Sequence, residues 1–309
     1  MARYHVQGRT NSLRIVSLLA GATEIVCALD AGKMLVGRSH ECDSPEWVRE
    51  LPACSGPAFD VTVSSGAIDT EVRRRIAAGE ELYRVHGDLI CELRPDLVIA
   101  QSHCEVCAVT PGDLERSGAC LPMLALSAAS VEGIFESIGQ VGARLGLEER
   151  AAAVVTRERS RLEAVRAQTA GLKRPSVVML EWADPLFAMG NWGPELVEIA
   201  NGELSIGRKG EYSVPMAGEK LMEADPEFLI VAPCGFNLER ALQEQAVLER
   251  NSWWSWLQAV RSGKVAFADG NLFFNRSGMT ISQTAEILHG GAFGEPTRGR
   301  HWRWIGDAA

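Results

Sequence analysis

The sequence predicts an α/β protein of two lobes, each built on a sheet rich in parallel strands, with one long α-helix joining them and a ligand cleft between them. Three observations support this prediction. The 309 residues amount to about twice the size of an ordinary domain. Short apolar runs typical of buried strands alternate with segments of helical period. Part of the first half also recurs, with the same spacing, in the second half.

The composition narrows the function classes. Apolar residues make up 46% and charged residues 23% of the chain, which are ordinary values for a globular protein with packed cores. The formal net charge is −9, and no run of Lys or Arg supplies the positive surface that nucleic acids or anionic lipids require. We therefore expect no nucleic-acid partner and no insertion into a membrane.

The amino-terminal residues predict a cytoplasmic location. Residues 1–11 lack the apolar core of a secretory signal. The apolar run that begins at Leu13 is interrupted by Gly21, Thr23 and Glu24, so it does not predict a membrane span. Eight cysteines are too few for a disulfide scaffold in a chain of this length. We expect a periplasmic location only if a leader peptide is missing from this sequence.

The repeat predicts two lobes of the same plan. Gly32-KMLVGRSHECDS-Pro45 and Gly202-ELSIGRKGEYSV-Pro215 agree at two glycines, an arginine, a glutamate and the final proline. The β-branched runs at 14–18 and 176–180 are each followed by a turn and a segment of helical period. In each half a proline also introduces a later buried-strand run, PDLVIA in the first and PEFLIVA in the second.

These patterns divide the chain into three parts. The amino-terminal lobe is expected over residues 12–128 and the carboxyl-terminal lobe over residues 174–309, with linker helices over residues 130–171. Ser130 can cap the first linker helix and Gly146 can end it. Its apolar positions have helical spacing: Val131, Ile134, Ile138, Val141 and Leu145.

The second linker helix constrains the architecture most. Residues 148–169 contain neither Pro nor Gly and are rich in Ala, Arg and Glu. A helix of this length spans roughly 33 Å, about the width of a lobe. It would hold the two lobes as a stiff spacer, and the cleft between them would lie at the carboxyl ends of the strands, where open α/β sheets bind ligands.

Several segments in this order resemble the helical-backbone group of ABC-transporter substrate-binding proteins, especially its cobalamin-binding and iron-siderophore-binding members. These segments are Arg14-IVSLLAGATEIVCALDAG, Arg94-PDLVIA, the linker helix, Gly190-NWGPELVEIANG and Val260-RSGKVAFADG. The resemblance implies two Rossmann-like lobes, a small hinge motion, and a ligand held by a few side chains from each lobe. It also implies that acidic residues on the outer faces dock on an ABC permease.

Cysteines and a histidine at predicted strand ends suggest a second kind of site. Strand alternation places His40 and Cys42 on one side of the chain, and Cys104 and Cys107 form a C-x-x-C after a buried strand. These four residues are candidate ligands of a soft metal, zinc or copper. The alternatives are two packed thiols without a role, thiols that act on the cobalt of a bound corrinoid, or a redox dithiol that lacks the thioredoxin context.

Further residues are predicted to line the cleft, together with Cys42 and Cys104. The indoles of Trp182 and Trp192 can stack on a large planar ligand, although Trp192 fits the lobe core equally well. Cys234 and its neighbour Phe236 follow a strand of the second lobe and would face the first lobe. Asn275 and Arg276 follow the last predicted strand, where Arg276 could hold a carboxylate, amide or phosphate.

Three functions remain compatible with these patterns. The first is a small-molecule binding protein, for cobalamin or a related corrinoid or metal chelate held in the cleft. The second is a cysteine-rich metal-binding protein or metalloenzyme that uses Cys42, Cys104 and Cys107. The third is an interaction module that has kept the fold and lost its ligand. The sequence contains no P-loop, no G-x-S-x-G and no H-E-x-x-H, so catalysis is not expected.

Overall fold

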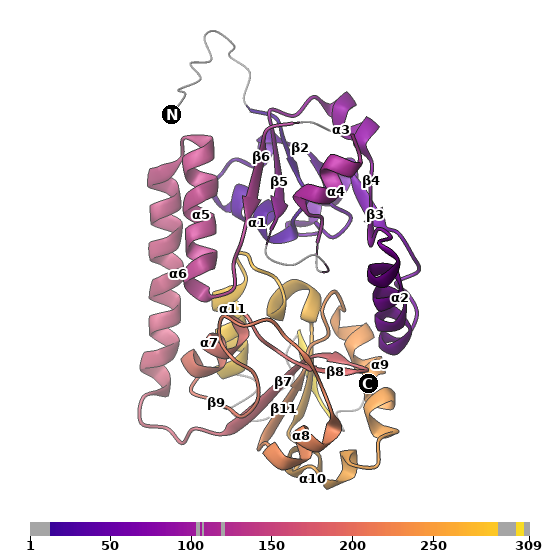
Figure 1. Ribbon diagram of the computed structural model, residues 1–309. Coiled ribbons are helices and arrows are strands. Elements are labelled where there is room, and N and C mark those ends of the chain that lie inside the picture. The colour runs from indigo at the N-terminus through magenta and orange to yellow at the C-terminus, as the bar shows by residue number, and fades with distance from the viewer. Residues whose placement is uncertain (1–12, 103–105, 107, 119–120, 290–300, 306–309) are drawn as a thin grey trace.

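The computed structural model describes residues 13–102, 106, 108–118, 121–289 and 301–305. Within these ranges the chain forms two α/β lobes, one above the other in Figure 1, and two long helices lie side by side along one edge of the pair. The fold class predicted from the sequence is therefore confirmed.

The amino-terminal lobe contains a parallel sheet whose strands have the order β2-β1-β5-β6 in the described part of the chain. The strands of the lobe are β1 (Ile15–Ser17), β2 (Leu35–Arg38), β3 (Ser55–Pro57), β4 (Tyr83–Val85), β5 (Leu97–Gln101) and β6 (Met123–Leu126), with β3 and β4 forming a separate antiparallel pair. The helices are α1 (Ala20–Ala28), α2 (Ser65–Ala78), α3 (Gly87–Leu93) and α4 (Pro111–Arg116), with 3-10 turns η1 (Gly32–Met34) and η2 (Glu46–Glu50).

The carboxyl-terminal lobe contains a larger mixed sheet of order β10-β8-β7-β11-β12-β13, in which β9 also pairs with β7. Its strands are β7 (Ser176–Ala183), β8 (Leu186–Ala188), β9 (Glu203–Leu204), β10 (Pro215–Met216), β11 (Phe228–Val231), β12 (Val265–Ala268) and β13 (Trp302–Trp304). Its helices are α7 (Gly193–Ile199), α8 (Gly218–Ala224), α9 (Leu238–Glu249), α10 (Gln258–Arg261) and α11 (Ile281–Ile287), with shorter turns η3 (Trp254–Trp256) and η4 (Gly270–Phe274).

The repeated sequence plan appears as a repeated strand order. The parallel series β2-β1-β5-β6 of the first lobe corresponds to β9-β7-β11-β12 of the second. In the first lobe Leu35 pairs with Ile15, and in the second Leu204 pairs with Val177. The central strands are apolar and buried on both faces, as parallel sheets covered by helices require. Residues that follow parallel strands in both sheets, such as Leu19 after β1 and Cys234 after β11, lie at the junction of the lobes.

The linker consists of α5 (Val131–Leu145) and α6 (Glu148–Thr169), and both agree with the sequence prediction. The Ser130 hydroxyl accepts a hydrogen bond from the backbone N–H of Gly133 at 3.0 Å, and Gly146 ends the helix in the left-handed region. Helix α6 is continuous over 22 residues. It also contacts the second lobe, because the Ser282 hydroxyl on α11 donates to the buried Glu158 carboxylate.

Candidate ligand-binding cleft

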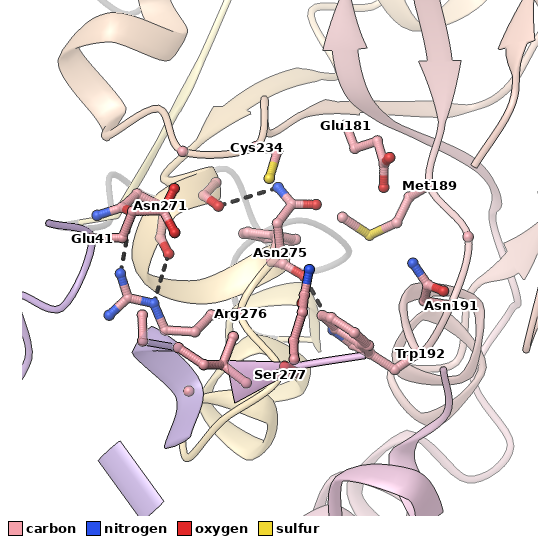
Figure 2. Close-up of a pocket in the computed structure, with 18 residues that line it drawn as sticks. Glu41, Glu181, Met189, Asn191, Trp192, Cys234, Asn271, Asn275, Arg276 and Ser277 are labelled. Atoms are coloured by element: carbon pink, nitrogen blue, oxygen red, sulfur yellow. Dashed lines mark hydrogen bonds between the residues drawn. The ribbon is translucent and has the colours of Figure 1, made fainter. Parts of the chain in front are cut away.

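A cavity of about 90 Å³ lies where the two lobes meet (Figure 2). Its walls come from segments that follow the carboxyl ends of strands in both sheets, the position at which open α/β sheets bind ligands. The first lobe contributes Leu19, Ala20, Gly21, Glu41 and Gln101, and the second contributes Glu181, Met189, Asn191, Trp192, Cys234, Asn271, Phe274, Asn275, Arg276, Ser277 and nearby glycines.

Arg276 joins the two lobes beside this cavity. Its Nη1 donates to Glu24 Oε1 at 2.9 Å and to Asp43 Oδ1 at 2.8 Å, and both carboxylates belong to the first lobe. Its Nε and Nη2 donate to the backbone and side-chain oxygens of Asn271. The Asn271 amide in turn donates to Asp43 Oδ2 at 2.8 Å. The Arg276 side chain is only 4% exposed, so the pairing is a buried link that holds the lobes together.

A second set of polar contacts joins the lobes near the start of α2. The Ser65 hydroxyl donates to Glu244 Oε2 on α9 at 2.6 Å. Trp182 Nε1 donates to the Ser65 carbonyl at 3.2 Å, and Arg240 Nη2 donates to the Val63 carbonyl at 2.9 Å. Together with the Arg276 cluster, these bonds hold the lobes in a closed arrangement.

The amide of Asn275 has a fixed orientation. Its Nδ2 donates to the Ala232 carbonyl at 2.7 Å and to the Gly270 carbonyl at 3.2 Å. Because carbonyl oxygens can only accept, the NH₂ group must face them and the Oδ1 atom must face the opposite way. Figure 2 shows this oxygen on the side of the cavity that faces Glu181 and Met189.

Four of the residues predicted for the cleft line the cavity. These are Trp192, Cys234, Asn275 and Arg276. Trp192 is also part of the lobe core, which was the alternative expected for it. It is 6% exposed, and its Nε1 donates to the Phe274 carbonyl at 3.2 Å.

Two further predicted residues lie outside the cavity wall. Trp182 and Phe236 pack against each other, with ring centroids 5.1 Å apart. The Trp182 indole N–H is used in the contact with Ser65. Its ring therefore supports the contact between the lobes rather than the cavity.

The predicted thiol site does not form around Cys42. This side chain is 1% exposed and packs inside the first lobe, where the Thr23 hydroxyl donates to its Sγ at 3.0 Å. Burial raises the pKa of the Cys42 thiol to about 12, so it stays protonated at neutral pH. Cys42 therefore does not line the cleft. Cys104 and Cys107 lie outside the described residues.

His40 is also engaged elsewhere. Its Nδ1 lies 3.0 Å from the Ser55 hydroxyl, and burial, aided by Arg38, lowers the pKa of the imidazole to about 4. Among the described residues, no group of three or more His, Cys, Asp or Glu side chains is arranged to hold a metal ion. No observation on this part of the chain supports the metal alternative.

Several wall residues were not predicted from the sequence. Glu41 lies in the turn after β2, Gln101 is the last residue of β5, and Glu181 lies within β7 near its end. Asn191 follows β8 and has a φ of 52°. Their shared signal is position, since each polar residue comes at the carboxyl end of a strand or in the loop after it. The sequence did not locate the strand ends precisely enough to identify these residues as wall residues.

Comparison of the whole sequence with known protein families identifies the family of this chain. The sequence profile of the periplasmic binding protein family matches residues 15–272, which is most of the chain. The chain belongs to this family. A comparison with curated proteins finds no match.

Solved structures show the same fold at low identity. A periplasmic heme binding protein from Pseudomonas aeruginosa superposes with a TM-score of 0.71 and 20% identity, covering 95% of this chain and 98% of that one. An ABC transporter substrate-binding protein from Listeria monocytogenes gives 0.69 and 21%, covering 90% and 98%. The periplasmic vitamin B12 binding protein BtuF of Vibrio cholerae gives 0.64 and 19%, covering 90% and 95%.

The predicted cytoplasmic location gains no support from these comparisons, because the family and two of these relatives are named as periplasmic. In the described ranges, no helix combines the length and the apolar character needed to cross a bilayer.

Glu41 in the cavity wall is expected to make stability depend on pH. Burial raises the pKa of its carboxyl to about 7, although Arg276 opposes the effect. The unfolded chain loses this proton near pH 4.5, so the folded state binds it more tightly and the free energy of unfolding falls as the pH rises from about 4.5 to 7. We expect Glu41→Gln to raise the free energy of unfolding by about 1–2 kcal/mol at pH 8, since partial exposure reduces the roughly 1.4 kcal/mol per pH unit of pKa displacement.

Urea unfolding at pH 4 and pH 8 measures this difference. Below pH 4.5 the two proteins should converge, because Glu41 is then protonated in both states. Glu71→Gln is the matched control of opposite sign, because Arg74 and Arg75 lower the pKa of Glu71 to about 2 and its loss should not stabilise the protein at pH 8. A Glu41→Gln variant that is no more stable than the wild type at pH 8 would contradict the prediction.

Proposed function

We propose that this protein captures cobalamin or a related corrinoid in the cleft between its lobes and delivers it to an ABC permease. Two supports come from the comparisons. The chain belongs to the periplasmic binding protein family, and structures of the same fold include proteins named for vitamin B12 and for heme. Both are large ring ligands of the tetrapyrrole type, and Trp192 places an aromatic ring in the cavity wall.

The charge of the cavity wall favours a corrinoid over heme, and this observation carries the proposal. In the described wall, the acidic side chains of Glu181 and of Glu41, whose pKa is raised to about 7, stand beside a single guanidinium, that of Arg276. Arg276 is already paired with Glu24 and Asp43. Among the described wall residues, the two propionates of heme would meet no cation other than the already paired Arg276, at a cost in desolvation and repulsion. The primary amides at the edge of a corrinoid instead donate N–H groups to acceptors.

The size of the cavity indicates that the lobes separate when the ligand enters. A volume of about 90 Å³ is well below the roughly 300–1,000 Å³ of pockets that hold drug-sized ligands. A corrinoid is larger than such a ligand. Entry must therefore break contacts such as those of Arg276 and Ser65 with the opposite lobe, and the described arrangement corresponds to a closed cleft.

The test is a direct comparison of three ligands on the purified full chain. Cyanocobalamin, dicyanocobinamide and hemin are titrated by isothermal calorimetry, with quenching of tryptophan fluorescence as the second signal. We expect at least one corrinoid to bind tenfold or more tightly than hemin. Tighter binding of hemin, or no heat with either corrinoid, would contradict the proposal. Excess cyanocobalamin should also raise the midpoint of thermal unfolding, because a ligand of the folded state stabilises it by mass action.

A further inference from the structure

Asn275 offers the cavity a hydrogen-bond acceptor whose direction the fold determines. Its two amide hydrogens are directed at the carbonyl oxygens of Ala232 and Gly270. Ala232 directly follows β11, and Gly270 opens the turn after β12. Rotating the amide by half a turn would place Oδ1 against two carbonyl oxygens and lose both bonds. The ligand therefore meets an oxygen at this position.

Glu181 places a carboxyl group on the same side of the cavity. Residue 181 lies in β7 beside the turn after β11, since the Cys234 backbone N–H donates to the Glu181 carbonyl at 3.0 Å. Figure 2 shows the Glu181 carboxylate and the Asn275 oxygen on the same side of the cavity, near the Met189 side chain. The Asn275 oxygen carries a partial negative charge, so it attracts donors and repels anions.

We propose that Asn275 is a specificity-determining residue that accepts a hydrogen bond from an N–H group of the ligand, and that it selects primary amides over carboxylates. This proposal rests on the proposed function, and it names the feature of the corrinoid edge that the cleft recognises. A carboxylate in place of the amide would set two acceptors against each other and leave both without a donor, which is costly in a buried site.

Small probes test the selection without assuming the cargo. The cavity of about 90 Å³ has room for a molecule of a few heavy atoms, so acetamide and acetate are a matched pair. The readout is the chemical shift of the Asn275 side-chain NH₂ group in a protein labelled with ¹⁵N-asparagine. We expect acetamide to shift this signal with at least tenfold higher affinity than acetate.

Variants separate selection from structural support. Asn275→Ala should reduce the preference for acetamide at least threefold, measured on the shifts of neighbouring backbone amides. Asn251→Ala is the matched control, because the Asn251 amide also donates to two backbone carbonyls, each at 3.2 Å, on the exposed end of α9. The control should leave the preference unchanged. If Asn275→Ala does not fold, the preference of the wild-type protein for acetamide over acetate, measured on the Asn275 signal, still tests the proposal.

Corrinoids extend the same test to large ligands. Dicyanocobinamide carries amides where dicyanocobyrinic acid carries carboxylates. The wild type should bind cobinamide at least tenfold more tightly, and Asn275→Ala should narrow that ratio. An equal fall in affinity for both compounds, or no preference for acetamide over acetate, would overturn the role of Asn275. A preference for acetamide without any corrinoid binding would support Asn275 and overturn the proposed function alone.

Discussion

Replacing Arg276 by methionine is expected to lower the free energy of unfolding by about 3–5 kcal/mol, the cost of removing one partner from a buried ion pair. The loss arises because Glu24 and Asp43 remain in the junction of the lobes without their counter-charge. Burial already raises the pKa of Glu24 above its ordinary value while Arg276 is present. Methionine approximates the length of the arginine stem, so the change removes the charge with little change in packing.

Urea unfolding at two pH values measures the effect and identifies its cause. Without Arg276, Glu24 can avoid an unpaired charge by binding a proton, so the destabilisation should be smaller at pH 5 than at pH 8. The double variant Arg276→Met/Glu24→Gln should recover part of the loss at pH 8. Arg74→Met is the matched control on α2, where the side chain is 49% exposed and pairs with Glu71 and Glu80. Its effect should be far smaller, because exposed pairs contribute little.

Equal losses for Arg276→Met and Arg74→Met would contradict the prediction, and so would a loss that does not change with pH. Equal losses would mean that the buried cluster contributes no more than an exposed ion pair, and a pH-independent loss would mean that an unpaired charge on Glu24 is not the cause. Small-angle scattering of Arg276→Met tests a second expected effect. The lobes should separate more readily once the pairing of Arg276 with Glu24 and Asp43 is removed. The radius of gyration should therefore increase in the absence of ligand.

The sequence predicted the elements whose signals are local. Helix α6 occupies the interval that lacks Pro and Gly, and α5 starts at the serine and ends at the glycine expected to cap it. The strands β1 and β5 are apolar on both faces, so a continuous apolar run identified them. These properties depend only on residues close together in the sequence. The internal repeat of the sequence then predicted two lobes.

The site could be predicted only in part, because its decisive contacts join residues far apart in the sequence. Arg276 was expected to meet a ligand, but its guanidinium pairs with Glu24, 252 positions away. Cys42 was placed by alternation along a strand, yet β2 ends at Arg38 and the turn that follows directs the thiol toward Thr23. Periodicity does not extend past the end of a strand, so it could not orient these side chains.

Replacing Gly21 by alanine is expected to force the lobes apart. A Cβ atom at Gly21 on α1 would lie 2.4 Å from the backbone oxygen of Ser277 in the opposite lobe and 2.8 Å from its carbonyl carbon. Backbone atoms cannot move aside as a flexible side chain can, so the clash is relieved only by a shift between the lobes. Alanine favours a helix over glycine by up to about 1 kcal/mol, but overpacking costs about 1–3 kcal/mol, so the net effect should be destabilising.

Gly139→Ala provides the matched control for this change. Gly139 lies within α5, and a Cβ atom there would meet nothing within 4 Å, so only the helix preference applies and the variant should be at least as stable as the wild type. Urea unfolding compares the two variants, and small-angle scattering should show a larger radius of gyration for Gly21→Ala alone. Wild-type stability and compactness in Gly21→Ala would show that the lobes do not need this close approach to form the closed cleft.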